Sequence, residues 1–119
     1  MSVERVPGPG KATFSKAVAV SGAGRTVYVS GHLSAKGSLA EQTHACFDQI
    51  EEALRAVGGS LEHVVRITAW LTRLDEYAEY NRVRGERFGK NLPASAAVQV
   101  AGLLQGALIE IDAVAFIPD

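Results

Sequence analysis

The order of strand-prone and helical segments constrains this chain of 119 residues more than any other feature. Strand-prone runs at 16–20 and 26–33 precede one helical segment, and a third run, 64–71, precedes another. Two further runs, 96–101 and 107–116, close the chain. This β-β-α-β-α-β-β order predicts an α+β fold in which one mixed sheet carries two helices on one face.

The first helix is expected over residues 39–57. Ser38 and Glu41 have the spacing of a capping box, and Gly58 supplies a left-handed stop. One helical face is apolar and consists of Cys46, Ile50, Ala53, Leu54 and Val57. These patterns predict a helix that packs one side on the sheet.

A second helix is expected over residues 75–88. Tyr77, Tyr80, Asn81, Arg84 and Phe88 fall near one side of it. The same segment holds a basic stretch interleaved with Glu79 and Glu86, formed by Arg82, Arg84, Arg87 and Lys90. We interpret this stretch as a solvated helix face, and an anion-binding edge is the alternative.

The ends and turns of the chain carry weaker signals. Residues 1–12 are interpreted as a loose N-terminal lead-in to a single domain spanning 1–119. The turn signal at 21–24 predicts a hairpin between the first two strands. Residues 1–10 lack an apolar core, so no signal peptide is expected and the protein is expected to be cytoplasmic.

Composition narrows the classes of function. Hydrophobic residues make up 47% and charged residues 21% of the chain, and the formal net charge is −1. These values exclude a disordered chain and argue against a nucleic-acid partner. Cys46 is the only cysteine, so an intrachain disulfide is impossible and a buried core position is expected.

The stretch 91–109 has no charged residue and approaches membrane-spanning length. Pro93, Gly102 and Gly106 divide it, so two buried strands fit better than a membrane helix. A single sheet with helices on one face leaves its other face, which includes Trp70, uncovered. We therefore expect an oligomer whose subunits cover that face.

Glu110 and Asp112 are the strongest chemical candidates found from spacing. They lie two apart in an apolar strand, so their side chains share a face. A carboxylate in such a strand indicates either a salt bridge to a neighbouring strand or subunit, or a functional group. Both readings stay open from the sequence.

The three histidines do not form a metal-binding pattern, and no metal is expected. His44 and His63 are expected to face solvent. His32 follows Ser30 and Gly31 at a strand end, where polar side chains often face a cleft. We keep it as a possible acid or base.

Taken together, several motifs resemble one family, from about residue 11 to residue 116. They are TFSKAV (13–18), VYVSGH (27–32), Gln42-Thr43, AVGGSLEHVVRITAWL (56–71), Tyr80-Asn81, LPAS (92–95) and GALIEIDAVA (106–115). The chain is similar to the RidA (YjgF) family, the reactive-intermediate deaminases also labelled endoribonuclease L-PSP. The last motif is the most specific.

The resemblance implies a chorismate-mutase-like (YjgF-type) fold and a homotrimer with small-molecule pockets at the subunit interfaces. Members of the deaminase type hydrolyse 2-imino or enamino acids without a metal or organic cofactor. The resemblance implies Glu110 as a catalytic candidate, and His32, kept for its position at the strand end, is the second one. The implied substrate-binding candidates are Phe14, Ser30, Gly31, Asn81, Ser95 and Ala97.

The chain departs from the family pattern at the substrate carboxylate. Ser95 stands where the family's P-A-R-S motif has an arginine that grips this carboxylate. Phe14 replaces a tyrosine and His32 replaces a glutamine. A serine hydroxyl cannot imitate a bidentate arginine, so poor binding of 2-imino acids is expected. Ser95→Arg is expected to restore part of that activity.

Three functions remain open from the sequence. One is an atypical enzyme that converts an imine or enamine lacking the usual carboxylate, in which Glu110 positions or deprotonates water. Another is a non-catalytic ligand-binding or regulatory trimer with a degraded site. Ribonuclease activity, suggested by the family's older label, is disfavoured by the net charge of −1.

Overall fold

The computed structural model describes residues 2–119. Its strands are β1 (Val3–Pro7), β2 (Ser15–Val20), β3 (Gly24–Leu33), β4 (Val64–Leu71), β5 (Ala94–Gln99) and β6 (Ile109–Pro118). Its α-helices are α1 (Leu39–Arg55) and α2 (Tyr77–Phe88), and the short 3-10 helices are η1 (Leu61–His63) and η2 (Leu104–Gly106).

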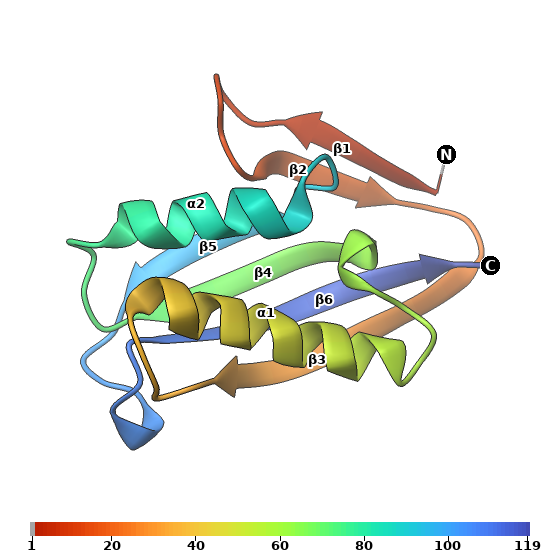
Figure 1. Ribbon diagram of the computed structural model, residues 1–119. Coiled ribbons are helices and arrows are strands. Elements are labelled where there is room, and N and C mark those ends of the chain that lie inside the picture. Colours follow the sequence, from red (N-terminus) through yellow and green to blue (C-terminus); the bar gives the residue numbers. More distant parts are fainter. Residues whose placement is uncertain (1) are drawn as a thin grey trace.

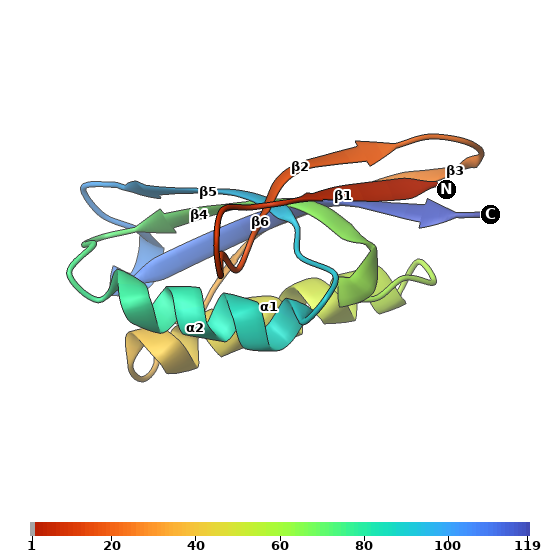
Figure 2. The same cartoon turned by 90° about the horizontal axis from the view of Figure 1, so that it is seen from above.

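The strands form one mixed sheet in the order β1-β2-β5-β4-β6-β3. β5 runs parallel to β2 and β4, while the other neighbouring strands are antiparallel. Both helices cover the same face of this sheet, as Figure 1 and the edge-on view of Figure 2 show. The predicted α+β architecture is therefore confirmed.

The predicted hairpin between residues 16–20 and 26–33 is wrong. β2 pairs with β1 instead, and it meets β5 only where Ser15 lies opposite Ala94. β3 lies at the far edge of the sheet, where it pairs with β6, a strand of the same ten-residue length. The segment expected to be a loose lead-in contains β1. This strand forms the hydrogen bonds with β2 that β3 was expected to form.

The core lies between the helices and the sheet. Its α1 members include three of the predicted apolar positions, Cys46, Ile50 and Leu54. From the sheet it takes the alternate residues of two central strands, namely Ile67, Ala69, Leu71, Ile109, Ile111, Ala113 and Ala115. Alternation along β6 therefore leaves Glu110 and Asp112 on the face that no helix covers, which we call the open face.

α1 begins at Leu39 as the sequence predicts, and it ends at Arg55, two residues before the predicted end at Val57. Ser38 Oγ accepts from the Glu41 N–H at 3.2 Å, and a Glu41 carboxylate oxygen accepts from the Ser38 N–H at 2.9 Å. The hydrogen bond that the Ser38 N–H donates to the Glu41 carboxylate, with a further contribution from the Ser38 hydroxyl, lowers the pKa of Glu41. α1 ends at Arg55, and Gly58 follows with φ 86°, a left-handed conformation that favours glycine.

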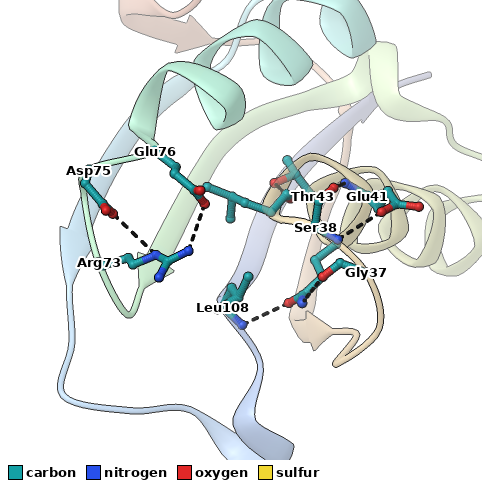
Figure 3. Close-up of polar contacts among 10 residues, drawn as sticks. Gly37, Ser38, Glu41, Thr43, Arg73, Asp75, Glu76 and Leu108 are labelled. Atoms are coloured by element: carbon teal, nitrogen blue, oxygen red, sulfur yellow. Dashed lines mark hydrogen bonds and ion pairs between the residues drawn. The ribbon is translucent and has the colours of Figure 1, made fainter.

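Gln42 ties the start of α1 to the start of β6. Its side-chain amide donates to the Gly37 carbonyl at 3.0 Å and accepts from the Leu108 N–H at 2.9 Å. Figure 3 draws both contacts as dashed lines, one at Gly37 and one at Leu108. Because Leu108 is two residues before Glu110, this contact fixes where the Glu110 strand begins.

Arg5 explains why the N-terminal segment is ordered. Its guanidinium donates to the Leu92 carbonyl at 2.8 Å, the Glu62 carbonyl at 2.9 Å and the Val64 carbonyl at 3.2 Å. Arg5→Met should lower the free energy of unfolding by about 2 kcal/mol. A hydrogen bond from a charged donor contributes roughly 1.5–3 kcal/mol net, and we expect the value of about one such bond because Arg5 is only half-buried. Urea denaturation measures this loss.

Arg55→Met is the matched control for Arg5. Arg55 is exposed and, among residues 2–119, pairs only with Glu51, at 3.6 Å on the same helix. Removing such a pair changes stability by about 0.5 kcal/mol or less. If the two variants lose the same stability, the account of Arg5 as the anchor of β1 is wrong.

Candidate functional site

Glu110 lies on the open face, against the backbone of β3. It stands opposite Leu33 in the β3–β6 register, and Gly31 lies under its carboxylate. A Cβ atom at Gly31 would collide with that carboxylate, so only glycine allows this approach. The structure thus brings together two predicted site residues, Gly31 and Glu110, at the end of β3.

Neither acidic residue of β6 forms an ion pair among residues 2–119. Glu110 and Asp112 are both half-buried, and no arginine, lysine or histidine of the described part of the chain lies within ion-pair distance of either. A salt bridge to a neighbouring strand of the same chain, one of the two readings from the sequence, is therefore not present. A half-buried carboxylate without a cation remains available to bind a ligand or accept a proton.

His32 lies on the other face of the sheet from Glu110. A bulge between Val29 and His32, which includes Ser30 and Gly31, shifts the alternation of β3. His32 therefore stands opposite the buried Ile111 on the helix-covered face. The structure does not bring His32 and Glu110 together within one chain.

His32 contacts two residues of α1, Gln49 and Cys46. Its Nδ1 lies 3.2 Å from the Gln49 side-chain oxygen, and its carbonyl accepts from the Cys46 thiol at 3.2 Å. Burial, with a smaller contribution from Glu110, raises the pKa of Cys46 to about 12. The thiol is therefore protonated at neutral pH, as expected of a core cysteine rather than a nucleophile.

The other histidines make structural contacts. His44 Nδ1 lies 3.2 Å from Arg87 Nη1, and His63 Nδ1 accepts from the Ser60 N–H at 3.1 Å. Both side chains are half-buried, so the expectation that they face solvent is wrong.

A second group of predicted residues gathers around Arg84, which the sequence placed on a solvated face. That interpretation holds for Arg82, which pairs with Glu79 at 2.8 Å and Glu86 at 3.0 Å in solvent. It is wrong for Arg84, because only 1% of its surface is exposed. The helical spacing with Tyr77, Tyr80 and Asn81 was the signal that places Arg84 on the buried side.

The Arg84 guanidinium uses all five of its N–H groups on neutral oxygens. Nε donates to Thr13 at 3.0 Å, Nη2 to Asn81 at 2.9 Å and Tyr77 at 3.1 Å, and Nη1 to Ser95 at 2.8 Å and Tyr80 at 3.4 Å. It also lies 5.3 Å from the ring centre of Phe14. We call these residues the Arg84 cluster.

The Arg84 cluster joins three segments that are distant in sequence. Thr13 and Phe14 precede β2, Asn81 lies on α2, and Ser95 lies on β5. Gly85 allows the approach, since a Cβ there would come within 2.8 Å of Thr13 Cγ2. This explains a glycine inside the helix. Burial raises the pKa of Tyr80, so its hydroxyl stays protonated.

Ala97 lies on the helix-covered side of the sheet, as Ser95 does. It lies two residues after Ser95 on β5, opposite Ala69 of β4, and is half-buried against the core. No side-chain hydrogen bond is available to it, so any role in binding is one of shape.

Glu110 and Gly31, which we call the Glu110 group, are separate from the Arg84 cluster within one chain. On β4, Ser95 stands opposite Ile67 and Glu110 stands opposite Trp70. Ile67 and Trp70 are three residues apart, so their side chains point to opposite faces of the sheet. Strand geometry puts the Cα atoms of Ser95 and Glu110 about 14 Å apart. One small molecule therefore cannot touch both groups of the same chain.

Metal and membrane sites were also sought among residues 2–119. No group of three or more histidine, cysteine, aspartate or glutamate side chains lies close enough to hold a metal ion. No helix in the same range is both long and apolar enough to cross a membrane.

Comparison of the sequence with known proteins identifies its family. The family model described as Endoribonuclease L-PSP matches residues 8–117. The chain belongs to this family. It is 34% identical over 121 residues to a RutC family protein of Pyrococcus abyssi, covering 95% of this chain and 92% of the relative. It is 36% identical over 110 residues to a rat 2-iminobutanoate/2-iminopropanoate deaminase, covering 86% and 78%.

Solved structures of this family have the same fold. A RidA protein from an Antarctic Psychrobacter superposes with a TM-score of 0.75 at 32% identity, covering 98% of this chain and 99% of that one. A Mycobacterium tuberculosis member of the YjgF family gives a TM-score of 0.76 at 30% identity, covering 98% and 100%. The resemblance to the RidA/YjgF family found in the sequence is thus confirmed.

Proposed function

We propose that this protein is a cofactor-free hydrolase of small imines or enamines, with its site between two copies of the chain. The observation that carries the proposal is the half-buried Glu110 carboxylate, which has no cation partner among residues 2–119 and lies against Gly31. Membership of a family that includes 2-iminobutanoate/2-iminopropanoate deaminases supports the choice of reaction.

The open face supports an assembly of copies. Tyr28 is 80% exposed and Val98 43% exposed on this face, and Trp70 and Val114 lie between them half-buried. An apolar sheet face of this kind is typical of an interface. Because the Glu110 group and the Arg84 cluster are apart in one chain, a neighbouring copy would bring the second group to the first. We propose a homotrimer, as the family resemblance implies.

The chemistry follows from the position of Glu110. Its carboxylate takes a proton from water as the water oxygen attacks the imine carbon. Glu110 returns this proton to the imine nitrogen, which gives a neutral carbinolamine. Glu110 then moves the carbinolamine hydroxyl proton to nitrogen as the C–N bond breaks, so that ammonia leaves and a carbonyl compound remains. A positioned base of this kind contributes about 10²–10⁴-fold to the rate.

An ammonia-release assay tests the proposal. An amino-acid oxidase generates 2-iminobutanoate in place, and ammonia and 2-oxobutanoate are followed with and without the protein, while sedimentation equilibrium measures the assembly. We expect faster hydrolysis from a particle of about three times the 12.6 kDa chain mass. An unchanged rate for this and other small imines, or a stable monomer, would contradict the proposal.

A non-catalytic ligand-binding trimer is the second candidate. Arg84 favours it, because every N–H group of this guanidinium is already used inside the chain. The same assay separates the two candidates. A binding protein would protect an imine or leave its hydrolysis rate unchanged while still forming the assembly.

A further inference from the structure

A cavity of about 480 Å³ lies between the N-terminal strand and the end of β6. Its walls include Arg5 of β1, His63 of η1, Asn91 after α2, and Phe116 and Pro118 of β6. The volume is typical of small-molecule sites in proteins. Phe116 is six residues from Glu110, about 20 Å along an extended strand, so this cavity is separate from the Glu110 group.

Arg5 brings a positive charge to the cavity and has N–H groups left to donate. Three of its five N–H groups donate to backbone carbonyls, which leaves Nε–H and one N–H of Nη2. Nε has no hydrogen-bond partner within residues 2–119 and is not sealed from solvent. No aspartate or glutamate of the same range lies within ion-pair distance of the guanidinium. Burial lowers the pKa of Arg5, but an arginine stays charged at neutral pH, so the site favours an anion.

His63 and Asn91 add two neutral donors. Nδ1 of His63 accepts from the Ser60 N–H at 3.1 Å, so the proton of the neutral ring is on Nε2. The Nε2–H and the Asn91 amide have no partner within the described residues, and neither is sealed from solvent. The donors of the cavity therefore come from three segments, namely β1, η1 and the loop after α2.

We propose that this cavity binds a small organic phosphate. The phosphate oxygens accept from Arg5, His63 and Asn91, and the organic substituent packs against the side chains of Phe116 and Pro118. Phosphate suits donors that come from three segments because it has three terminal acceptor oxygens, whereas a carboxylate has two. This is a second site, and the proposal does not depend on the proposed function.

Glu62 is the acidic residue that lines the cavity. Its side chain is exposed, and its carboxylate accepts from the Ser60 hydroxyl at 3.3 Å. Its charge opposes an anion in the cavity. Glu62→Gln should therefore tighten phosphate binding about threefold at low ionic strength, and added salt should reduce this gain.

Calorimetry with three probes tests the site. Phenyl phosphate, inorganic phosphate and benzoate are titrated into the wild-type protein at low ionic strength. We expect phenyl phosphate to bind at least tenfold more tightly than benzoate, and inorganic phosphate to compete with it more weakly. Arg5→Met should weaken phenyl phosphate binding at least tenfold, and Asn91→Leu about threefold, since the first removes a charged donor and the second a neutral one.

Arg55→Met is the matched control, because it removes the same charge from an exposed position on α1. It should leave the affinity within twofold of wild type. Equal binding of benzoate and phenyl phosphate would overturn the proposal, and so would unchanged affinity in folded Asn91→Leu and Glu62→Gln variants. A phosphotyrosine peptide that binds more tightly than phenyl phosphate would overturn the choice of a small ligand.

The test stays decisive if Arg5→Met loosens β1. Within residues 2–119 the Asn91 side chain forms no hydrogen bond, and the Glu62 carboxylate accepts only from Ser60. Neither side chain joins two elements of the sheet, so Asn91→Leu and Glu62→Gln report on binding and not on folding.

Discussion

Ser95→Arg should destabilise the protein severely instead of restoring deaminase activity. The new side chain would start where Ser95 Oγ now lies, 2.8 Å from Arg84 Nη1. Two guanidinium groups about 4 Å apart repel each other by roughly 4 kcal/mol at an effective dielectric constant near 20. We expect the free energy of unfolding in urea to fall by about 3 kcal/mol or more.

A double variant shows whether repulsion is the cause. Arg84→Met/Ser95→Arg keeps one guanidinium in the cluster and moves it from α2 to β5. It should be more stable than Ser95→Arg alone, with a coupling of about 2 kcal/mol between the two positions. Additive losses would mean that Ser95→Arg acts by steric overpacking, and the picture of a charged Arg84 cluster would need revision.

The sequence predicts most of the fold because local signals and global arrangement agree there. The capping box at Ser38 and Glu41 and the strand 64–71 form as predicted, and the predicted apolar face of α1 does so except at Val57, which lies beyond the helix and is exposed. The hairpin prediction fails because strand pairing is decided by distant segments. β1 pairs with β2 and β6 pairs with β3, and no local sequence pattern indicates these distant partners.

The candidate site is predictable only in part, for a similar reason. Alternation along β6 correctly places Glu110 and Asp112 on one face. The face on which His32 lies could not be predicted, because a bulge changes the alternation of β3 and leaves no clear periodic signal. Arg84 is misjudged because its charge suggests solvent, although its five partners come from three separate segments.

Glu110→Gln should lower turnover about 100-fold or more while leaving the chain folded. Glutamine keeps the shape of the side chain but cannot take a proton from water, which is the loss expected for a general base. Because Glu110 forms no ion pair within residues 2–119, the free energy of unfolding should change by about 0.5 kcal/mol or less. The ammonia-release assay and urea denaturation measure the two quantities on the same preparation.

Asp112→Asn is the matched control for Glu110→Gln. Asp112 lies two residues further along β6, on the same face and equally without an ion-pair partner in the described chain, but it stands opposite Thr68 and not against Gly31. It should keep turnover within a few-fold of wild type. If Glu110→Gln instead separates the subunits at unchanged intrinsic activity, Glu110 pairs with a cation of a neighbouring copy. The role of this carboxylate would then be to hold the assembly together.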